Sequence, residues 1–141
     1  QQEVAAAREA NCLVKLAGPL VTTAANAAME FDLSQVDMTK VAALFVVFSV
    51  GASSGTASVS ANDSVVSTIC SNNNSTSAGI VWLMPLNDTI GAFSTYATTR
   101  SNASTMSNGA NTSVAWTALT KVTISGTSYS GATATLFAVK Q

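Results

Sequence analysis

The sequence predicts an all-β protein, an antiparallel β-sandwich or jelly roll of about seven or eight strands. Short runs of β-branched and aromatic residues are separated by turns of Gly, Ser and Asn, and only one short stretch favours a helix. Serine and threonine make up 37 of the 141 residues, whereas charged residues make up 9%. A chain of this length suits one domain. We therefore expect an N-terminal arm, residues 1–18, followed by one β-sandwich domain, residues 19–141.

The N-terminal arm combines a weak helical signal with a short apolar segment. Residues 2–11 hold Ala, Glu and Arg, which favour a helix, but the stretch is too short to be stable alone. Residues 12–16 (CLVKL) are mostly apolar and precede Gly18-Pro19. Such an arm can bury apolar side chains on a neighbouring subunit. The residues expected to make these contacts are Val4, Cys12, Leu13, Val14 and Leu16.

The rest of the chain alternates between strand signals and turn signals. The strongest signal is the run 41–50 (VAALFVVFSV), which predicts a central strand that is apolar on both faces. Residues 51–55 and 126–131 predict hairpin turns, and residues 71–78 and 87–113 predict polar loops, the second with at most one weak strand. The strands expected in chain order cover residues 29–33, 41–50, 56–60, 65–70, 79–86, 117–125 and 132–139.

The absence of histidine excludes the commonest catalytic and metal-binding arrangements. No Ser-His-Asp triad, Cys-His dyad or histidine metal ligand can form. A nucleophilic serine would need one of the four lysines as its base. Lys121 alternates with Val122 and Ile124, so it should point outward and keep a high pKa. We therefore expect no enzyme activity and no cofactor.

The carboxylates offer two candidate sites, neither of which we expect to be functional. Glu30 and Asp32 share one strand face at roughly 6–7 Å, a spacing that a glycosidase pair can use. Because a glycosidase also needs aromatic platforms, we expect this pair to be the solvated face of its strand. Asp32, Asp37 and Asp88 could supply oxygen ligands to calcium, but no calcium-loop motif joins them. We expect no metal site.

Charge and hydropathy exclude two classes of partner. Six Lys and Arg residues in a chain of net charge −1 cannot form the basic footprint that nucleic acids need. The longest apolar run has about half the length that a membrane-spanning helix requires.

The outward positions of the expected strands are rich in Thr, Ser and Ala, which pack closely against an uncharged neighbour. This composition favours a subunit of an assembly over an isolated secreted domain.

Cys12 and Cys70 allow two interpretations. They could form a disulfide that ties the arm to a central strand, or they could remain two buried thiols. Spacing alone does not show that the sulfurs meet, so both interpretations stay open.

Six Asn-x-Ser/Thr sequons are compatible with a secreted glycoprotein or with an unmodified chain.

Two parts of the chain resemble small β-sandwich decoration proteins of tailed bacteriophages. Residues 29–34 (MEFDLS), the run 41–50 and the Gly-rich turn 51–56 resemble their opening strands. Residues 119–125 (LTKVTIS) and 132–139 (ATATLFAV) resemble their final hairpin. The matched segments cover roughly half of the chain, and residues 87–113 have no counterpart.

The resemblance implies a structural virion protein that decorates, or cements, the outer face of a phage head. Its implied partners are the major capsid protein and copies of itself, as a trimer. It implies no enzyme activity and no cofactor. The alternative expectation is a secreted pilus or fibre subunit that can carry N-linked sugars at its sequons. In it the N-terminal segment completes the sheet of the next subunit by donor-strand complementation.

Overall fold

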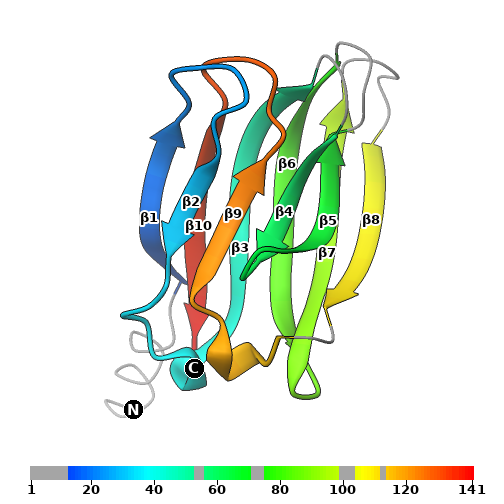
Figure 1. The fold of residues 1–141 in the computed structure, drawn as a ribbon. Helices are drawn as coiled ribbons and strands as arrows, with labels where there is room; N and C mark the ends of the chain where they lie inside the picture. Colours follow the sequence, from blue (N-terminus) through cyan, green and yellow to red (C-terminus); the bar gives the residue numbers. More distant parts are fainter. Residues whose placement is uncertain (1–12, 53–55, 71–74, 99–103, 112–113) are drawn as a thin grey trace, which may run out of the picture.

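The computed structural model describes residues 13–52, 56–70, 75–98, 104–111 and 114–141 (Figure 1). They form a β-sandwich, which confirms the predicted fold class, but with more strands than expected. The elements in chain order are β1 (Leu13–Val21), β2 (Met29–Asp32), η1 (Met38–Lys40), β3 (Val41–Ala52), β4 (Ala57–Ala61), β5 (Ser64–Cys70), β6 (Ser75–Leu86), β7 (Thr89–Thr98), β8 (Ser104–Asn111), η2 (Trp116–Ala118), β9 (Lys121–Ser125) and β10 (Thr133–Lys140), where η marks a 3₁₀ helix.

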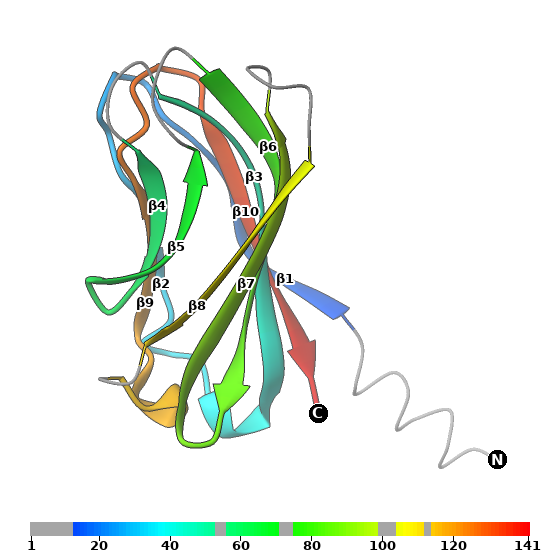
Figure 2. The ribbon, with the colours of Figure 1, turned by 90° about the vertical axis from the view of Figure 1, so that its right-hand side faces the viewer.

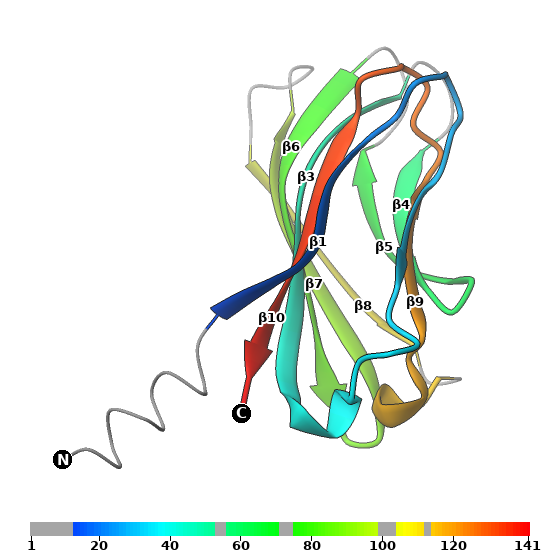
Figure 3. The same cartoon turned by 90° about the vertical axis from the view of Figure 1, so that its left-hand side faces the viewer.

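The strands form two antiparallel sheets that face each other (Figures 2 and 3). The large sheet has the order β1-β10-β3-β6-β7-β8, and the small sheet has the order β2-β9-β4-β5. If β7 and β8 are set aside, each sheet has four strands and most connections cross between the sheets, which is the arrangement of a jelly roll. β7 and β8 extend the large sheet beyond β6, and β8 also lies beside β5 of the small sheet (Figure 2).

The core lies between the inner faces of the two sheets. Alternate residues of each strand point inward, so Val46, Leu83 and Leu136 of the large sheet meet Val59 and Ile124 of the small sheet, all of them fully buried. A polar pair adds to this core. The hydroxyl of Ser67 on β5 donates a hydrogen bond of 2.9 Å to the hydroxyl of Ser94 on β7. This bond joins the sheets where apolar side chains are few.

The two 3₁₀ helices close one end of the sandwich. Trp116 of η2 is buried, and its indole N–H donates to the carbonyls of Met38 at 3.2 Å and Val41 at 3.3 Å. The buried indole therefore has its donor satisfied while it covers the core. None of the described residues forms a helix that is both long and apolar enough to span a membrane.

Both predicted hairpin connections are wrong. β3 pairs with β10 and β6, whereas β4 pairs with β9 and β5 in the other sheet, so the chain crosses between sheets after residue 52. It crosses again between β9 and β10, where we expected the hairpin loop 126–131. β4 is consequently an interior strand and not an edge. Local turn signals predicted the reversals, but they carry no information on which sheet receives the next strand.

The predicted loops also contain strands. β6 begins at Ser75, inside the expected loop 71–78, and β7 and β8 occupy most of the expected loop 87–113. Residues 89–98 escaped prediction because their inward positions include small residues, Ala92 and Ser94, so the hydrophobic alternation is weak.

The first described strand includes part of the expected N-terminal arm. Leu13 pairs with Val139 and Lys15 pairs with Phe137, so the boundary expected after residue 18 falls within β1. Leu16 packs against the core, Val14 is half-buried and Leu13 is exposed. Val4 and Cys12 lie outside the described residues.

Candidate functional site

The outer faces of the two sheets have opposite chemistry. On the small sheet the outward side chains are mostly polar: Glu30 and Asp32 on β2 pair with Thr123 and Lys121 on β9. Further hydroxyls continue this surface on β4 and β5. On the large sheet the outward side chains are mostly apolar. The sandwich is therefore amphipathic across its thickness.

A row of aromatic side chains crosses the outer face of the large sheet. Phe137 on β10 pairs with Phe45 on β3, Phe45 pairs with Trp82 on β6, and Trp82 pairs with Phe93 on β7. Directly paired residues of antiparallel strands share one face, so the four rings lie side by side on four adjacent strands. We call this row, with the outward residues on either side of it, the aromatic face.

Aliphatic side chains flank the row and are exposed. On one side lie Leu13, which is 54% exposed, and Met84, which is 37% exposed. On the other side Val47, which is 42% exposed, pairs with Ile80. A contiguous apolar surface of this kind marks an interaction site on a protein in water.

The rings stand on edge on the sheet. Phe45 and Phe137 are stacked, with centroids 4.9 Å apart and planes 11° apart, and the centroid of Trp82 is 4.6 Å from that of Phe45. Because adjacent rings cover each other's faces, Phe45 is only 8% exposed although it lies on an outer face. Sugar-binding platforms present ring faces to the ligand, whereas Phe45 and Phe137 present edges. This geometry favours packing against another protein surface over stacking on a sugar.

Charge is almost absent from the aromatic face. Among its described side chains only Lys15, which pairs with Phe137, is charged, and it lies at the β1 edge. The segments of β7 and β8 contain no charged residue in their sequences. An uncharged surface loses little hydration when an apolar neighbour covers it.

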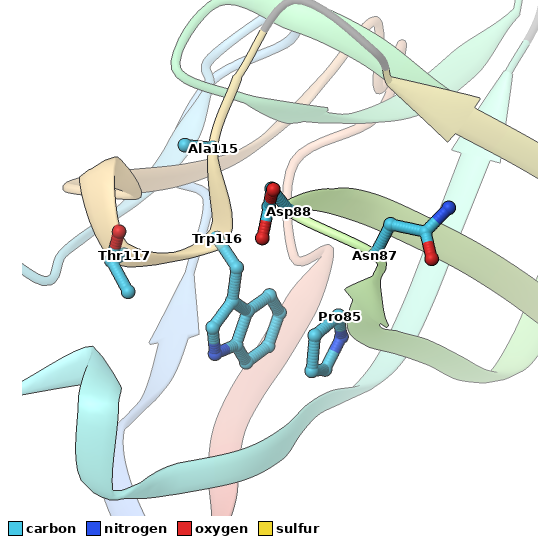
Figure 4. A pocket seen from close by; sticks show the side chains of 6 residues that line it. All are labelled: Pro85, Asn87, Asp88, Ala115, Trp116 and Thr117. Carbon is cyan, nitrogen blue, oxygen red and sulfur yellow. The ribbon is translucent and has the colours of Figure 1, made fainter.

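A hollow of about 220 Å³ lies at the end of the sandwich where β6 turns into β7 (Figure 4). Pro85 and the Trp116 ring line it together with Asn87, Asp88 and Thr117. The Trp116 indole N–H is already used by two carbonyls, and the exposed Asp88 is the only ionisable side chain in the lining. Asp88 therefore has no second ionisable group beside it in this lining.

The carboxylates considered in the sequence are spread over the surface. Glu30 and Asp32 are exposed on β2, as expected for a solvated strand face. Hydrogen bonds from the hydroxyl and N–H of Ser34 lower the pKa of Asp32, and those from Thr39 lower the pKa of Asp37. Asp32 accepts a hydrogen bond from the N–H of Ser34, and Asp37 caps the N-terminus of η1 through the N–H of Thr39, so both act as local caps. Within the described ranges no group of three potential metal ligands occurs.

Lys121 belongs to a structural cluster at the turn between β4 and β5. Its amine lies 2.8 Å from the carboxylate of Asp63, and this hydrogen bond raises the pKa of Lys121. The prediction that Lys121 points outward and keeps a high pKa is confirmed. A lysine that stays protonated cannot serve as the base for a nucleophilic serine.

Residues 51–55 (GASSG) match the Gly-x-Ser-x-Gly pattern of hydrolase nucleophile elbows. That motif requires a strand followed by a helix, whereas here β3 is followed by strand β4. Histidine, the usual base of such a serine, is absent from the chain. Residues 53–55 lie outside the described ranges, so we assign no role to Ser53.

Both interpretations of Cys12 and Cys70, a disulfide or two buried thiols, stay predictions. Cys70 is fully buried at the end of β5, and Cys12 lies outside the described residues. Of the predicted arm contacts, Leu13 lies at the border of the aromatic face, whereas Leu16 contacts the chain's own core.

The sequence reasoning missed the aromatic face. The available signal was the alternation in β3 and β10, where Phe45, Val47 and Phe137 occupy the positions opposite the core residues. The run 41–50 was correctly predicted to be apolar on both faces, and such strands are normally covered on both. The aromatic character of the second face emerges only when the register brings Trp82 beside Phe45.

No protein-family model matches the chain, and no curated protein matches it significantly.

Proposed function

We propose that this chain is a structural subunit without enzyme activity, which works by packing against neighbours in a large assembly. The aromatic face carries this proposal, because soluble monomers rarely expose a contiguous apolar surface that spans several strands. The low charge of the chain fits the same role. Charged residues, which keep soluble proteins apart, make up 9% of the sequence.

The specific assembly that we propose is a phage virion, with this chain as a decoration or cement protein on the outer face of the head. Two observations support this choice. The sequence resembles such proteins in its opening and closing segments, and the jelly-roll arrangement is common among viral capsid proteins. Because one fold serves many functions, the resemblance carries more weight than the topology.

Binding to capsid shells tests the proposal. Purified chain is mixed with shells of the source phage that lack it, and the mixture is sedimented. We expect saturable co-sedimentation of the unchanged protein. Shells that remain bare at saturating concentrations would contradict the proposed decoration role.

Two matched lysine variants test whether the aromatic face matters. Val47→Lys places a charge on that face, whereas Val65→Lys places one at a 62% exposed valine on the small sheet. We expect Val47→Lys to reduce shell binding at least tenfold and Val65→Lys to bind as the unchanged chain does. Equal binding of the two variants would show that shell binding does not depend on the aromatic face.

The fibre or pilus alternative has less support. Donor-strand complementation uses an N-terminal strand that is free to leave its own subunit. Here residues 13–21 form β1, which pairs with β10 of the same chain. Intact-mass measurement of the native protein separates the two proposals, because hexose masses at Asn residues would favour the fibre.

A further inference from the structure

The geometry points to a second copy of this chain as the neighbour that covers the aromatic face, in a two-fold pair with the large sheets back to back. This inference rests on the proposed structural role and adds the identity of one partner. The resemblance to decoration proteins led us to expect a trimer, whereas the features of this face fit a pair.

The aromatic face is large enough for a stable pair. Strands lie about 4.8 Å apart, and outward residues along a strand repeat about every 6.6 Å. The four strands that a two-fold axis between β3 and β6 places over one another, β10, β3, β6 and β7, and four rows of outward residues therefore give a flat area of about 500 Å² per copy. Two copies would bury about 1,000 Å², which is the smallest area expected for a specific interface.

The order of strands makes this face complementary to itself. The middle of the large sheet lies between β3 and β6, with β10 and β1 on one side and β7 and β8 on the other. A two-fold axis that runs between the two copies, parallel to β3 and β6, places β3 of one copy over β6 of the other. Each row of side chains then meets the same row of the second copy, as an isologous interface requires.

This pairing brings apolar groups together along the whole row. Phe45 of one copy lies over Trp82 of the other, so the exposed ring edges of the two aromatic rows meet. In the neighbouring row Val47 lies over Ile80. Edge-to-face contacts between aromatic rings and contacts between aliphatic side chains are favourable in such a dry interface.

The single charge of the face does not oppose the pair. Lys15 lies at the β1 edge, which the two-fold axis places over the β8 edge of the other copy. The two Lys15 side chains are consequently at opposite ends of the interface. Each remains near solvent, and the like charges are as far apart as the face allows.

Molar mass in solution, without shells, tests the pair. Light scattering during gel filtration should give twice the 14.3 kDa mass of the chain for the unchanged protein and for Val65→Lys. Val47→Lys and Met84→Lys should elute as monomers at the same concentration. Both altered residues are exposed, so far-UV circular dichroism should show that these variants stay folded.

Mixed cysteine variants test the orientation of the pair. Val47 and Ile80 are neighbours within one copy, so each is changed to Cys in a separate chain and the two proteins are mixed under oxidising conditions. We expect a cross-linked dimer from the mixture in excess over that from either variant alone or from the unchanged chain.

Four outcomes would overturn the inference: a monomeric or trimeric mass for the unchanged chain, a dimer that survives both lysine substitutions, loss of the dimer in Val65→Lys, or cross-linking of the mixture no greater than in the single-variant controls. A monomer that still decorates shells would reject the pair and leave the proposed function intact. A dimer that leaves shells bare would reject the proposed decoration role alone.

Discussion

Asn62 holds the turn between β4 and β5 against the segment that leads into β9. Its side-chain oxygen accepts hydrogen bonds from the N–H groups of Thr120 at 3.0 Å and Lys121 at 3.1 Å, and its amide donates to the carbonyl of Ala118 at 2.9 Å. Its φ of 45° lies in the left-handed region, which Asn tolerates better than most residues. One side chain therefore fixes a turn and connects it to a segment far along the chain.

Replacing Asn62 by Ala should lower the free energy of unfolding by about 2 kcal/mol, since several hydrogen bonds are lost and backbone groups are left without their partner. Urea denaturation measures the change. Asn87→Ala is the control, because Asn87 has a similar φ of 54° but makes no side-chain hydrogen bond within the described part of the chain. If the two variants lose the same stability, the hydrogen bonds of Asn62 contribute nothing.

At the scale of secondary structure, Gly79 allows β6 and β7 to approach each other. A Cβ atom at this position would lie 2.2 Å from the carbonyl oxygen of Thr95 and 2.6 Å from the Cα of Tyr96, both of which are backbone atoms. Backbone cannot move aside as a flexible side chain can. This glycine is therefore required by the close pairing of β6 with β7.

Gly79→Ala should reduce stability by about 3 kcal/mol through steric overlap. Gly91→Ala, on β7, should be neutral, because the nearest atom to its Cβ would be 3.4 Å away in the Leu86 side chain. Thermal unfolding followed by circular dichroism compares the two. A Gly79→Ala variant as stable as the Gly91→Ala variant would contradict the close approach of β6 and β7.

Sequence reasoning succeeded where periodicity was strong and failed where the position of a strand depended on distant pairing. The alternation of Met29 and Phe31 with Glu30 and Asp32 predicted one buried and one solvated face on β2, and this is confirmed. The hairpin predictions failed because consecutive strands of a jelly roll usually belong to different sheets. The aromatic row was missed because it requires the mutual register of β10, β3 and β6, which are distant in sequence.

At the scale of the whole molecule, the outer faces of the two sheets differ in polarity. The small sheet presents hydroxyl and carboxylate groups that remain hydrated, and the large sheet presents the aromatic row. The chain therefore has one face that favours solvent and one that favours a neighbour. This asymmetry is what the proposed structural role requires of a β-sandwich with few charges.

The most direct test is whether Trp82 and Met84 are covered in the native particle. Hydroxyl-radical oxidation followed by mass spectrometry compares the intact particle with the isolated Val47→Lys chain, and the 40% exposed Tyr129 is the internal reference. We predict that Trp82 and Met84 oxidise at least fivefold more slowly in the particle, while Tyr129 changes little. Equal oxidation rates of Trp82 and Met84 in the two samples would contradict the account.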